Sequence, residues 1–359
     1  MLRKTLKLLR LGVVLLVAYL IFWPVQIAPV AWEAPPSKSY TGDYFPNTAL
    51  KSIERIDLNG ETGPEDAAEG PDGRIFMASH GGKILAYDPV KGTTSEFADT
   101  GGLPLGISAL TDGTIVVADA AKGLLSITPS GVVSVLTDTA PDGTAINYAD
   151  DLDIAPDGSI YFTDASTKFG AVEFGGTFPA SFLDLMEHGG HGRVLKLDPA
   201  TGQTSLVMDG LNFANGLAIN AAGTHFLLVE TGEYSITRVA LDGSDPTTIV
   251  ENTPCFPDNI ARAQDGTFWF GCVSPRSEDA DNMSTKPFLR KLVMRLPASM
   301  RPEATRYGLV VHIDETGKVL ETLQDPTGGF AYTTGLIEAR DGTRYITSLR
   351  EPNLGKLAP

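Results

Sequence analysis

Cysteine and histidine are scarce in this chain of 359 residues, and their scarcity excludes several kinds of protein. There are two cysteines, Cys255 and Cys272, and five histidines. Two cysteines cannot build a disulfide framework, and no His/Cys spacing of the zinc-binding type occurs. We expect two separate thiols. A single bridge between them is the alternative if the compartment is oxidising.

Positive charge and the common catalytic motifs are also in short supply. The chain has 28 Lys and Arg against 44 Asp and Glu, a formal net charge of −16. Such a surface repels nucleic acid, so we expect no nucleic-acid partner, whereas it is compatible with cation binding. Neither a G-x-S-x-G elbow nor a phosphate-binding P-loop is present. The sequence therefore gives no support to a serine hydrolase or a P-loop nucleotidase.

The N-terminus carries the one long hydrophobic run. Basic residues precede an uncharged stretch over 11–32, and these are Arg3, Lys4, Lys7 and Arg10. About 20 apolar residues span a bilayer, and basic residues stay on the cytoplasmic side. We predict a cytoplasmic tip and membrane anchor over 1–32, with the remaining chain on the periplasmic, lumenal or extracellular side. A cleaved signal peptide is the alternative, but an A-x-A site is missing. Residues 33–50, rich in proline, are interpreted as a linker.

One pattern recurs through the rest of the chain. A turn ending in Gly separates two alternating β-forming segments, which is a strong hairpin signal. The turns are Asp72-Gly73, Asp112-Gly113, Asp157-Gly158, Ala222-Gly223, Asp265-Gly266 and Asp341-Gly342. Successive turns lie 40, 45, 65, 43 and 76 residues apart. A period near 40–45 residues with about four strands is typical of a propeller blade. We predict an all-β, six-bladed β-propeller over 51–359.

Two features depart from the regular repeat. The long intervals contain insertions, roughly 169–190 and 274–306. The last blade has room for only three strands after Thr333, while residues 51–58 form a spare strand before blade one. We predict that this strand completes blade six and protects its open edge.

The repeat also predicts a ring of polar side chains. The residues seven positions before each turn are Glu65, Leu105, Asp150, Asn215, Asp258 and Thr334, and those that follow them are Asp66, Gly106, Asp151, Gly216, Asn259 and Gly335. The first strand of each blade lines the central channel, so equivalent positions should meet at one of its ends. Converging carboxylates are costly unless a cation neutralises them. Oxygen ligands without Cys or His favour calcium, magnesium or manganese, and calcium tolerates such irregular geometry. Capping of strand ends by Asp and Asn is the simpler alternative.

Hairpin pairing suggests candidate proton carriers. With two-residue turns His80 would face Glu65, and Asp164 would face Asp151. His188 and His191, at the end of the first insertion, are weaker candidates for the channel mouth. A structural hydrogen bond is the simpler role for each of these residues.

Several segments together resemble the strictosidine synthase-like group of six-bladed propellers, which shares a superfamily with paraoxonases and gluconolactonases. They are GPEDAAEGPDGRIF, YADDLDIAPDGSIYFTDASTKF, GRVLKLDP, NGLAI and CFPDNI, and the similarity covers about residues 51–357. The resemblance implies a catalytic calcium ion, and positions matching its paraoxonase ligands are Glu65, Asp150, Asn215, Asp258 and Asn259. It also implies that Asp66 and Asp151 match ligands of a second, structural calcium ion.

Two departures from the related enzymes bear on activity. The paraoxonase histidine pair is replaced by Leu105 and Asp119. The glutamate of strictosidine synthase falls near Tyr332, and no acidic residue follows until Glu338.

The leading hypothesis is a calcium-dependent hydrolase of lactones or simple esters, in which Asp258, Asp150 or Asp164 accepts a proton from water and the insertions cover the channel mouth. A non-catalytic, membrane-tethered propeller with structural calcium is the main alternative. An amine–aldehyde condensing enzyme is a third and weaker one.

Overall fold

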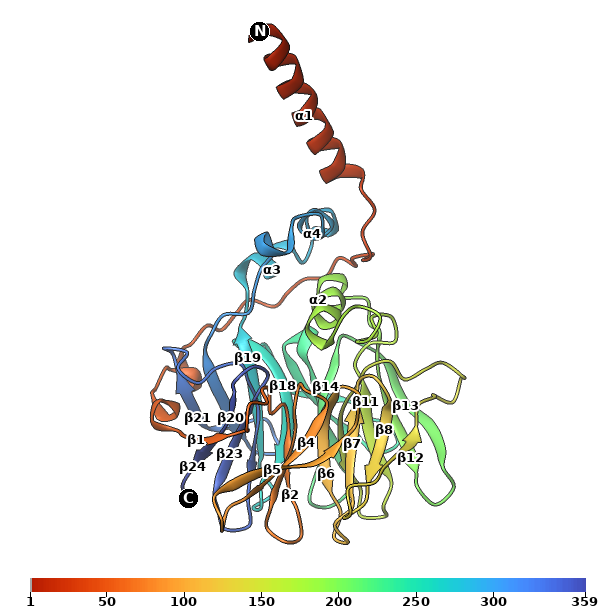
Figure 1. Ribbon diagram of the computed structural model, residues 1–359, viewed down its shortest axis with the longest axis vertical. Helices are drawn as coiled ribbons and strands as arrows, with labels where there is room; N and C mark the ends of the chain where they lie inside the picture. The colour runs from red at the N-terminus through yellow and green to blue at the C-terminus, as the bar shows by residue number, and fades with distance from the viewer. Residues whose placement is uncertain (1) are drawn as a thin grey trace.

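Six four-stranded antiparallel sheets surround a central axis in the computed structural model, which describes residues 2–359 (Figure 1). Blade one holds β2 (Ala67–Glu69), β3 (Ile75–Ala78), β4 (Lys83–Asp88) and β5 (Thr93–Asp99). Blade two holds β6 (Pro104–Ala109), β7 (Ile115–Asp119), β8 (Gly123–Ile127) and β9 (Val133–Thr137). Blade three holds β10 (Ala149–Ile154), β11 (Ile160–Asp164), β12 (Gly192–Asp198) and β13 (Gln203–Leu211). The first half of the predicted propeller is thus confirmed.

The remaining blades follow the same order. Blade four holds β14 (Ala214–Ile219), β15 (His225–Glu230), β16 (Ser235–Ala240) and β17 (Thr247–Val250). Blade five holds β18 (Cys255–Arg262), β19 (Phe268–Pro275), β20 (Gly308–Ile313) and β21 (Val319–Asp325). Blade six holds β22 (Thr333–Glu338), β23 (Arg344–Ser348), β24 (Asn353–Leu357) and, from the start of the propeller, β1 (Glu54–Asp57). The strand predicted to close the ring pairs with β24 as expected, from Glu54 opposite Lys356 to Asp57 opposite Asn353.

The six predicted turns join the first two strands of every blade. Each turn glycine has a positive φ, from 64° at Gly223 to 88° at Gly113, a conformation that side chains disfavour. In five blades the turn aspartate accepts a hydrogen bond from the backbone N–H two residues after itself, as Asp157 does from Ser159 at 2.9 Å. The repeated Asp-Gly pair is therefore a backbone device that fixes the blades in a common register.

The core lies between neighbouring blades. Phe76 and Ala78 of β3, for example, pack with Ile107 of β6 and Val117 of β7. Blade five also contains a disulfide between Cys255 of β18 and Cys272 of β19, whose Cα atoms are 5.7 Å apart. The expectation of two separate thiols is wrong, because the pairing of β18 with β19 brings the two cysteines together.

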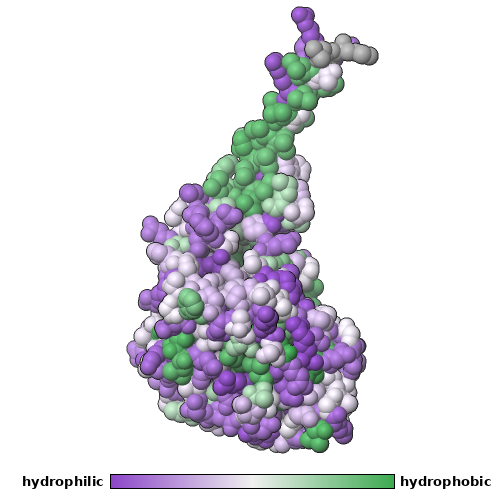
Figure 2. All heavy atoms as spheres, turned by 90° about the vertical axis from the view of Figure 1, so that its left-hand side faces the viewer, coloured by the Kyte–Doolittle hydropathy of each residue, from purple (hydrophilic) through white to green (hydrophobic). Residues whose placement is uncertain are grey.

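The N-terminal helix α1 (Leu2–Phe22) projects from the propeller, and its apolar surface stands out in Figure 2. Residues Arg3–Phe22 are apolar enough and long enough to cross a membrane. The helix ends ten residues before the predicted end of the anchor at Trp32, because Pro24 cannot continue it. Its uncharged part, residues 11–22, is about 18 Å long at 1.5 Å per residue.

The segment after the helix lies on the propeller and is not a free linker. It contains two 3₁₀ turns, η1 (Gly42–Tyr44) and η2 (Ala49–Ser52), and Tyr44 and Leu50 are buried. Asn47 donates to the carbonyl of Thr322 in β21 at 2.9 Å and accepts from the Gln324 N–H at 3.0 Å. Proline-rich composition marks an extended segment, but it says nothing about whether that segment docks.

The two insertions form helices above the same end of the channel (Figure 1). The first contains α2 (Thr177–Glu187). The second contains α3 (Glu278–Met283), α4 (Pro287–Met294) and the 3₁₀ turn η4 (Ala298–Met300). A further 3₁₀ turn, η3 (Thr231–Glu233), follows β15 in blade four.

Candidate functional site

A cavity of about 410 Å³ lies where the two insertions cover the channel mouth. Its inner end is formed by ring residues of the blades, and its outer walls by α2 and by the second insertion. Aromatic and aliphatic side chains dominate these walls: Tyr148, Phe178, Phe182, Leu185, Met186, Phe213, Tyr234 and Phe256. The volume and the apolar lining are typical of a site for a small organic molecule.

Five of the six predicted ring positions line this cavity. They are Glu65, Leu105, Asp150, Asn215 and Asp258. The sixth, Thr334, is buried and donates a 2.5 Å hydrogen bond to the backbone carbonyl of Glu65. The structure thus brings together side chains that are up to 193 residues apart in the sequence, from Glu65 to Asp258, at one end of the channel.

A register shift accompanies the ring position in five blades. The pairing of the first two strands is irregular between Pro104 and Ile107, Ala149 and Leu152, Ala214 and Leu217, Pro257 and Ile260, and Thr333 and Leu336. A bulge bends a strand locally and redirects its side chains, which is why bulges are frequent beside functional sites. The predicted cross-strand partner of Asp164 was wrong for this reason, because Asp164 pairs with Ala149 and not with Asp151.

Three buried oxygen atoms at the ring have no hydrogen-bond partner in the described residues 2–359. They are Glu65 Oε2, Asn215 Oδ1 and Asn259 Oδ1. The other ends of these side chains are held in place: Asn259 Nδ2 donates to Glu65 Oε1 at 3.0 Å, and Asn215 Nδ2 donates to Thr231 Oγ1 at 3.2 Å. Buried polar atoms are nearly always satisfied in folded proteins. Three unpartnered acceptors at one site therefore point to a binding site for a ligand.

The carboxylates of the ring destabilise one another. Burial first, and then the neighbouring Asp258 and Asp150, raise the pKa of Glu65 well above its usual value. Burial likewise raises the pKa of Asp258 to about 7, although the Asn259 N–H and contacts with Glu65 and Asn215 oppose this shift. Burial and the Asp258 charge raise the pKa of Asp150. A cation would remove this cost, because it stabilises the ionised form of all three groups.

The residues present could hold a hard cation. Across residues 2–359, no group of three or more His, Cys, Asp or Glu side chains is arranged to hold a metal ion by itself. At this ring, however, amide oxygens of Asn215 and Asn259 stand beside the carboxylates, and such amides are good ligands for calcium. The unpartnered oxygens belong to this mixed set of donors.

Asp66 and Asp151 have partners of their own. Asp66 Oδ2 accepts from the Ile107 N–H of the next blade at 2.9 Å. Asp151 Oδ2 accepts from the Leu217 N–H at 2.7 Å, and its Oδ1 from the Leu152 N–H at 2.7 Å. Burial raises the pKa of both, that of Asp66 to about 7. These carboxylates link neighbouring blades, and a second ion at this position stays a prediction.

The two other candidate proton carriers lie outside the cavity lining. Asp164 is buried in an ion pair with Arg193, whose Nε and Nη2 lie 2.9 Å and 2.8 Å from Oδ2, and its Oδ1 accepts from the Tyr148 N–H. His80 is exposed on the surface. The position of Asp164 follows from the register shift in blade three, which moves the second strand relative to the ring.

The two loop histidines are structural. His191 bonds Glu187 of α2 at 2.8 Å, and His188 pairs with Glu233 at 3.1 Å while stacking on Trp32. Sequence reasoning missed Trp32 as a cavity residue, because nothing in its proline-rich surroundings indicates docking. It also missed Tyr148, Tyr234 and Arg276, which line the cavity from loops outside the repeat positions.

Comparison with known proteins agrees with this architecture. The profile of the family "Strictosidine synthase" matches residues 150–244, and that of "Strictosidine synthase-like, N-terminal" matches residues 42–87. Human adipocyte plasma membrane-associated protein is 30% identical over 358 residues, covering 93% of this chain and 84% of the relative. STRICTOSIDINE SYNTHASE-LIKE 10 of Arabidopsis thaliana is 31% identical, covering 90% and 91%. The chain belongs to the strictosidine synthase-like family of six-bladed propellers.

Solved structures share the fold at lower identity. A gluconolactonase from Xanthomonas campestris has a TM-score of 0.62 and 18% identity, covering 92% of this chain and 98% of that one. Regucalcin from Agrobacterium tumefaciens, described as a calcium-binding protein, has a TM-score of 0.60 and 13% identity, covering 85% and 94%. At these identities the likeness establishes the propeller fold alone.

Proposed function

We propose that the chain is a calcium-dependent hydrolase of lactones or simple esters. One observation carries the proposal: unpartnered buried oxygens and destabilised carboxylates lie at the inner end of an apolar cavity. The fold is shared with a gluconolactonase and a calcium-binding regucalcin, which agrees with both parts of it.

Glu65, Asn215, Asp258 and Asn259 would hold the ion, with Asp150 beside them. A bound calcium ion would polarise the substrate carbonyl and favour ionisation of water. The chain's own residues would position the substrate: the aromatic walls exclude water and hold the apolar body, which leaves the carbonyl directed at the ring. Of the three predicted proton acceptors, Asp150 and Asp258 line the cavity, while Asp164 is committed to Arg193.

The condensing activity of strictosidine synthase finds no support in blade six. Among described residues its contribution to the cavity wall is Leu349, and no carboxylate of this blade lines the cavity. The cavity's other acidic residues, Glu278 and Glu303, come from the second insertion.

For location, we propose a single-pass anchor with a cytoplasmic N-terminus and the propeller on the periplasmic, lumenal or extracellular side. The basic residues that precede the apolar part of α1 support this orientation. Because the uncharged part of the helix is short, Lys7 and Arg10 would extend their side chains to the lipid headgroups.

The test is hydrolysis of a panel of lactones and aryl esters by the full-length chain in detergent, with calcium and with chelator. Asp258→Asn should lower turnover at least about 100-fold, because it removes one of the negative charges that hold the ion, and the ion would stabilise the oxyanion. Asp265→Asn, at the outer turn of the same blade, is the matched control and should leave turnover unchanged.

Each other result has a clear meaning. If no compound is hydrolysed, but calcium raises the melting temperature of the wild type and not of Asp258→Asn, the chain is a non-catalytic propeller with structural calcium. If calcium changes neither turnover nor melting temperature, the ring holds no calcium.

A further inference from the structure

Residues 23–37, here called the strap, cross the end of the propeller that carries the cavity. At its start, Arg295 donates to the carbonyls of Trp23 at 2.7 Å and Leu20 at 3.2 Å, and so caps the end of α1. Tyr19 donates in return to the Arg295 carbonyl at 3.0 Å. The strap therefore leaves the helix in a fixed direction.

Both insertions hold the middle of the strap. The Val30 N–H donates to the Glu187 carbonyl at the end of α2 at 2.9 Å, and the Trp32 N–H donates to the Ser284 carbonyl after α3 at 3.2 Å. The Arg290 guanidinium, buried in α4, donates to the carbonyls of Val30, Glu187 and Ser284. The Arg290 side chain thus joins the strap to both insertions.

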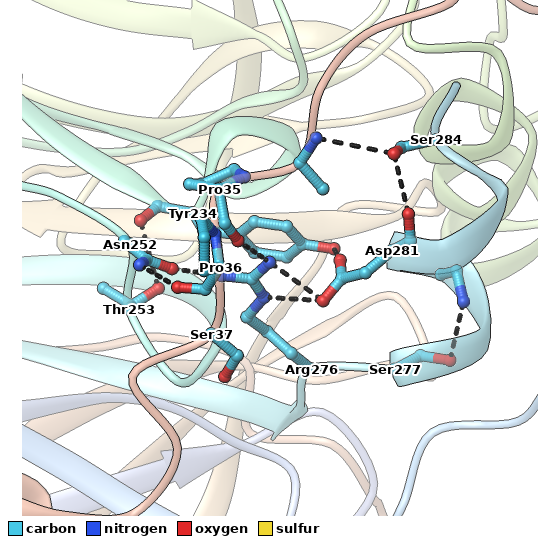
Figure 3. A network of polar contacts seen from close by, with 12 residues as sticks. Pro35, Pro36, Ser37, Tyr234, Asn252, Thr253, Arg276, Ser277, Asp281 and Ser284 are labelled. Carbon is cyan, nitrogen blue, oxygen red and sulfur yellow. Dashed lines mark hydrogen bonds and ion pairs between the residues drawn. The ribbon is translucent and has the colours of Figure 1, made fainter.

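The end of the strap is held by the network in Figure 3. Arg276 Nη2 donates to the Pro35 carbonyl at 2.6 Å and to Asp281 Oδ2 at 2.8 Å. Asn252 donates to the Pro36 carbonyl and accepts from Arg276. Proline has no backbone N–H, so this segment can donate few hydrogen bonds of its own. Side-chain donors fix it instead through the carbonyls of Pro35 and Pro36.

These contacts place Trp32 in the cavity wall. Its indole stacks on the His188 ring at a centroid distance of 3.9 Å and an angle of 8°, and it lies 6.0 Å from the Tyr234 ring. Tyr234 in turn contacts Phe256 at 5.2 Å. Trp32, Tyr234 and Phe256 all line the cavity, which gives it an aromatic wall.

We propose that Trp32 is a specificity-determining residue, which selects substrates that carry a flat aromatic group. This inference rests on the proposed hydrolase function. The ester or lactone carbonyl would face the ring, and the aromatic group would lie against Trp32, Tyr234 and Phe256. The strap, which directly follows the membrane anchor, would thus be part of the substrate site. A fragment that begins after residue 37 would lack Trp32 and this aromatic wall.

The kinetic test compares Trp32→Ala with the wild type in the full-length chain, on an aryl-substituted lactone and on a small aliphatic lactone. For the aryl substrate we expect kcat/KM to fall about 10-fold or more through a higher KM, because aromatic contacts are lost. For the aliphatic substrate we expect a change of less than about twofold. Trp23→Ala is the matched control, since Trp23 belongs to the strap but is 60% exposed. Equal effects of Trp32→Ala on both substrates, or none, would overturn the proposal.

A binding test separates this proposal from the hydrolase function. An aryl methyl ketone has no ester bond to hydrolyse, and it should quench the tryptophan fluorescence of Trp23→Phe but not of Trp23→Phe/Trp32→Phe. The remaining Trp269 is fully buried in blade five and stacks on His312. Quenching by a protein that hydrolyses nothing would support the aromatic site while refuting the hydrolase. Equal quenching in both variants would refute the site. The melting temperature of Trp32→Phe is the control for folding, and it should equal that of the wild type.

Discussion

At the scale of single residues, the ring shows how a fold can keep groups that destabilise it. Glu65 is buried beside Asp150 and Asp258, and its Oε2 has no partner among the described residues. The Asn259 amide nonetheless fixes the carboxylate, with bonds of 3.0 Å to Oε1 and 3.1 Å to the backbone carbonyl. Without a ligand, such an arrangement lowers the free energy of unfolding. A cation that binds only the folded state would raise it again.

Glu65→Gln should therefore change stability in opposite directions with and without calcium. In chelator the variant should be more stable than the wild type, by about 1 kcal/mol, because one buried charge is removed. At calcium near 100 times its Kd, the wild type should gain about 2.7 kcal/mol and the variant far less. Urea unfolding measures both, and Glu69→Gln, four residues later at the end of β2, is the control. The same order of stability in both buffers would contradict a cation at the ring.

Asp184 of α2 provides a pH test away from the ring. Burial raises its pKa to about 6, although the Ser166 hydroxyl at 2.5 Å opposes the shift. A carboxyl with a raised folded-state pKa binds its proton more tightly when folded. Its contribution to stability is present below about pH 3.8 and is lost as the pH rises to about 6.

Asp184→Asn should consequently be more stable than the wild type above pH 6, by about 2 kcal/mol, and the difference should shrink toward pH 4. Urea unfolding between pH 4 and pH 8 measures it. A difference that stays constant with pH would show that Asp184 does not titrate in this range.

At the scale of elements, sequence reasoning succeeded where the repeat carries the information. The turn glycine has a positive φ in every blade, and counting back from it placed Glu65, Asp150, Asn215 and Asp258 at the channel mouth, where they line the cavity. It failed for Asp164, because a bulge in the first strand leaves no mark in the spacing of the turns. It also failed for His80, because in the regular pairing of blade one the Glu65 N–H donates to the Ala78 carbonyl. Trp32 was out of reach for a different reason: its docking depends on Arg290 and Ser284, more than 250 residues away.

The disulfide of blade five also belongs to this scale. It joins Cys255 and Cys272, 17 residues apart, so it restricts the unfolded chain moderately. Reduction should lower the free energy of unfolding by about 3 kcal/mol. Urea unfolding with and without dithiothreitol measures this, and Cys255→Ala/Cys272→Ala should be insensitive to the reductant. Free thiols in the unreduced, denatured wild type would contradict the bond.

At the scale of the whole molecule, the first part of the chain has three separate tasks. Helix α1 is long and apolar enough to cross a membrane, the strap completes the cavity wall, and β1 completes blade six. The N-terminal and C-terminal parts of the chain therefore meet in one sheet, as Figure 1 shows for β1 and β24. Deletions from the N-terminus should remove first α1, then the strap and then β1.

A chain that begins at Lys38 keeps β1 and should remain a folded monomer. A chain that begins at Gly60 loses β1 and should not, because β24 becomes an open edge and the buried Leu50, Ile56 and Leu58 are removed. These three side chains contribute roughly 5 kcal/mol or more through burial. Size-exclusion chromatography and thermal unfolding distinguish the two chains. A synthetic peptide of residues 49–59 should restore the monomer by pairing with β24, and equal stability of both truncations would show that the ring closes without its first strand.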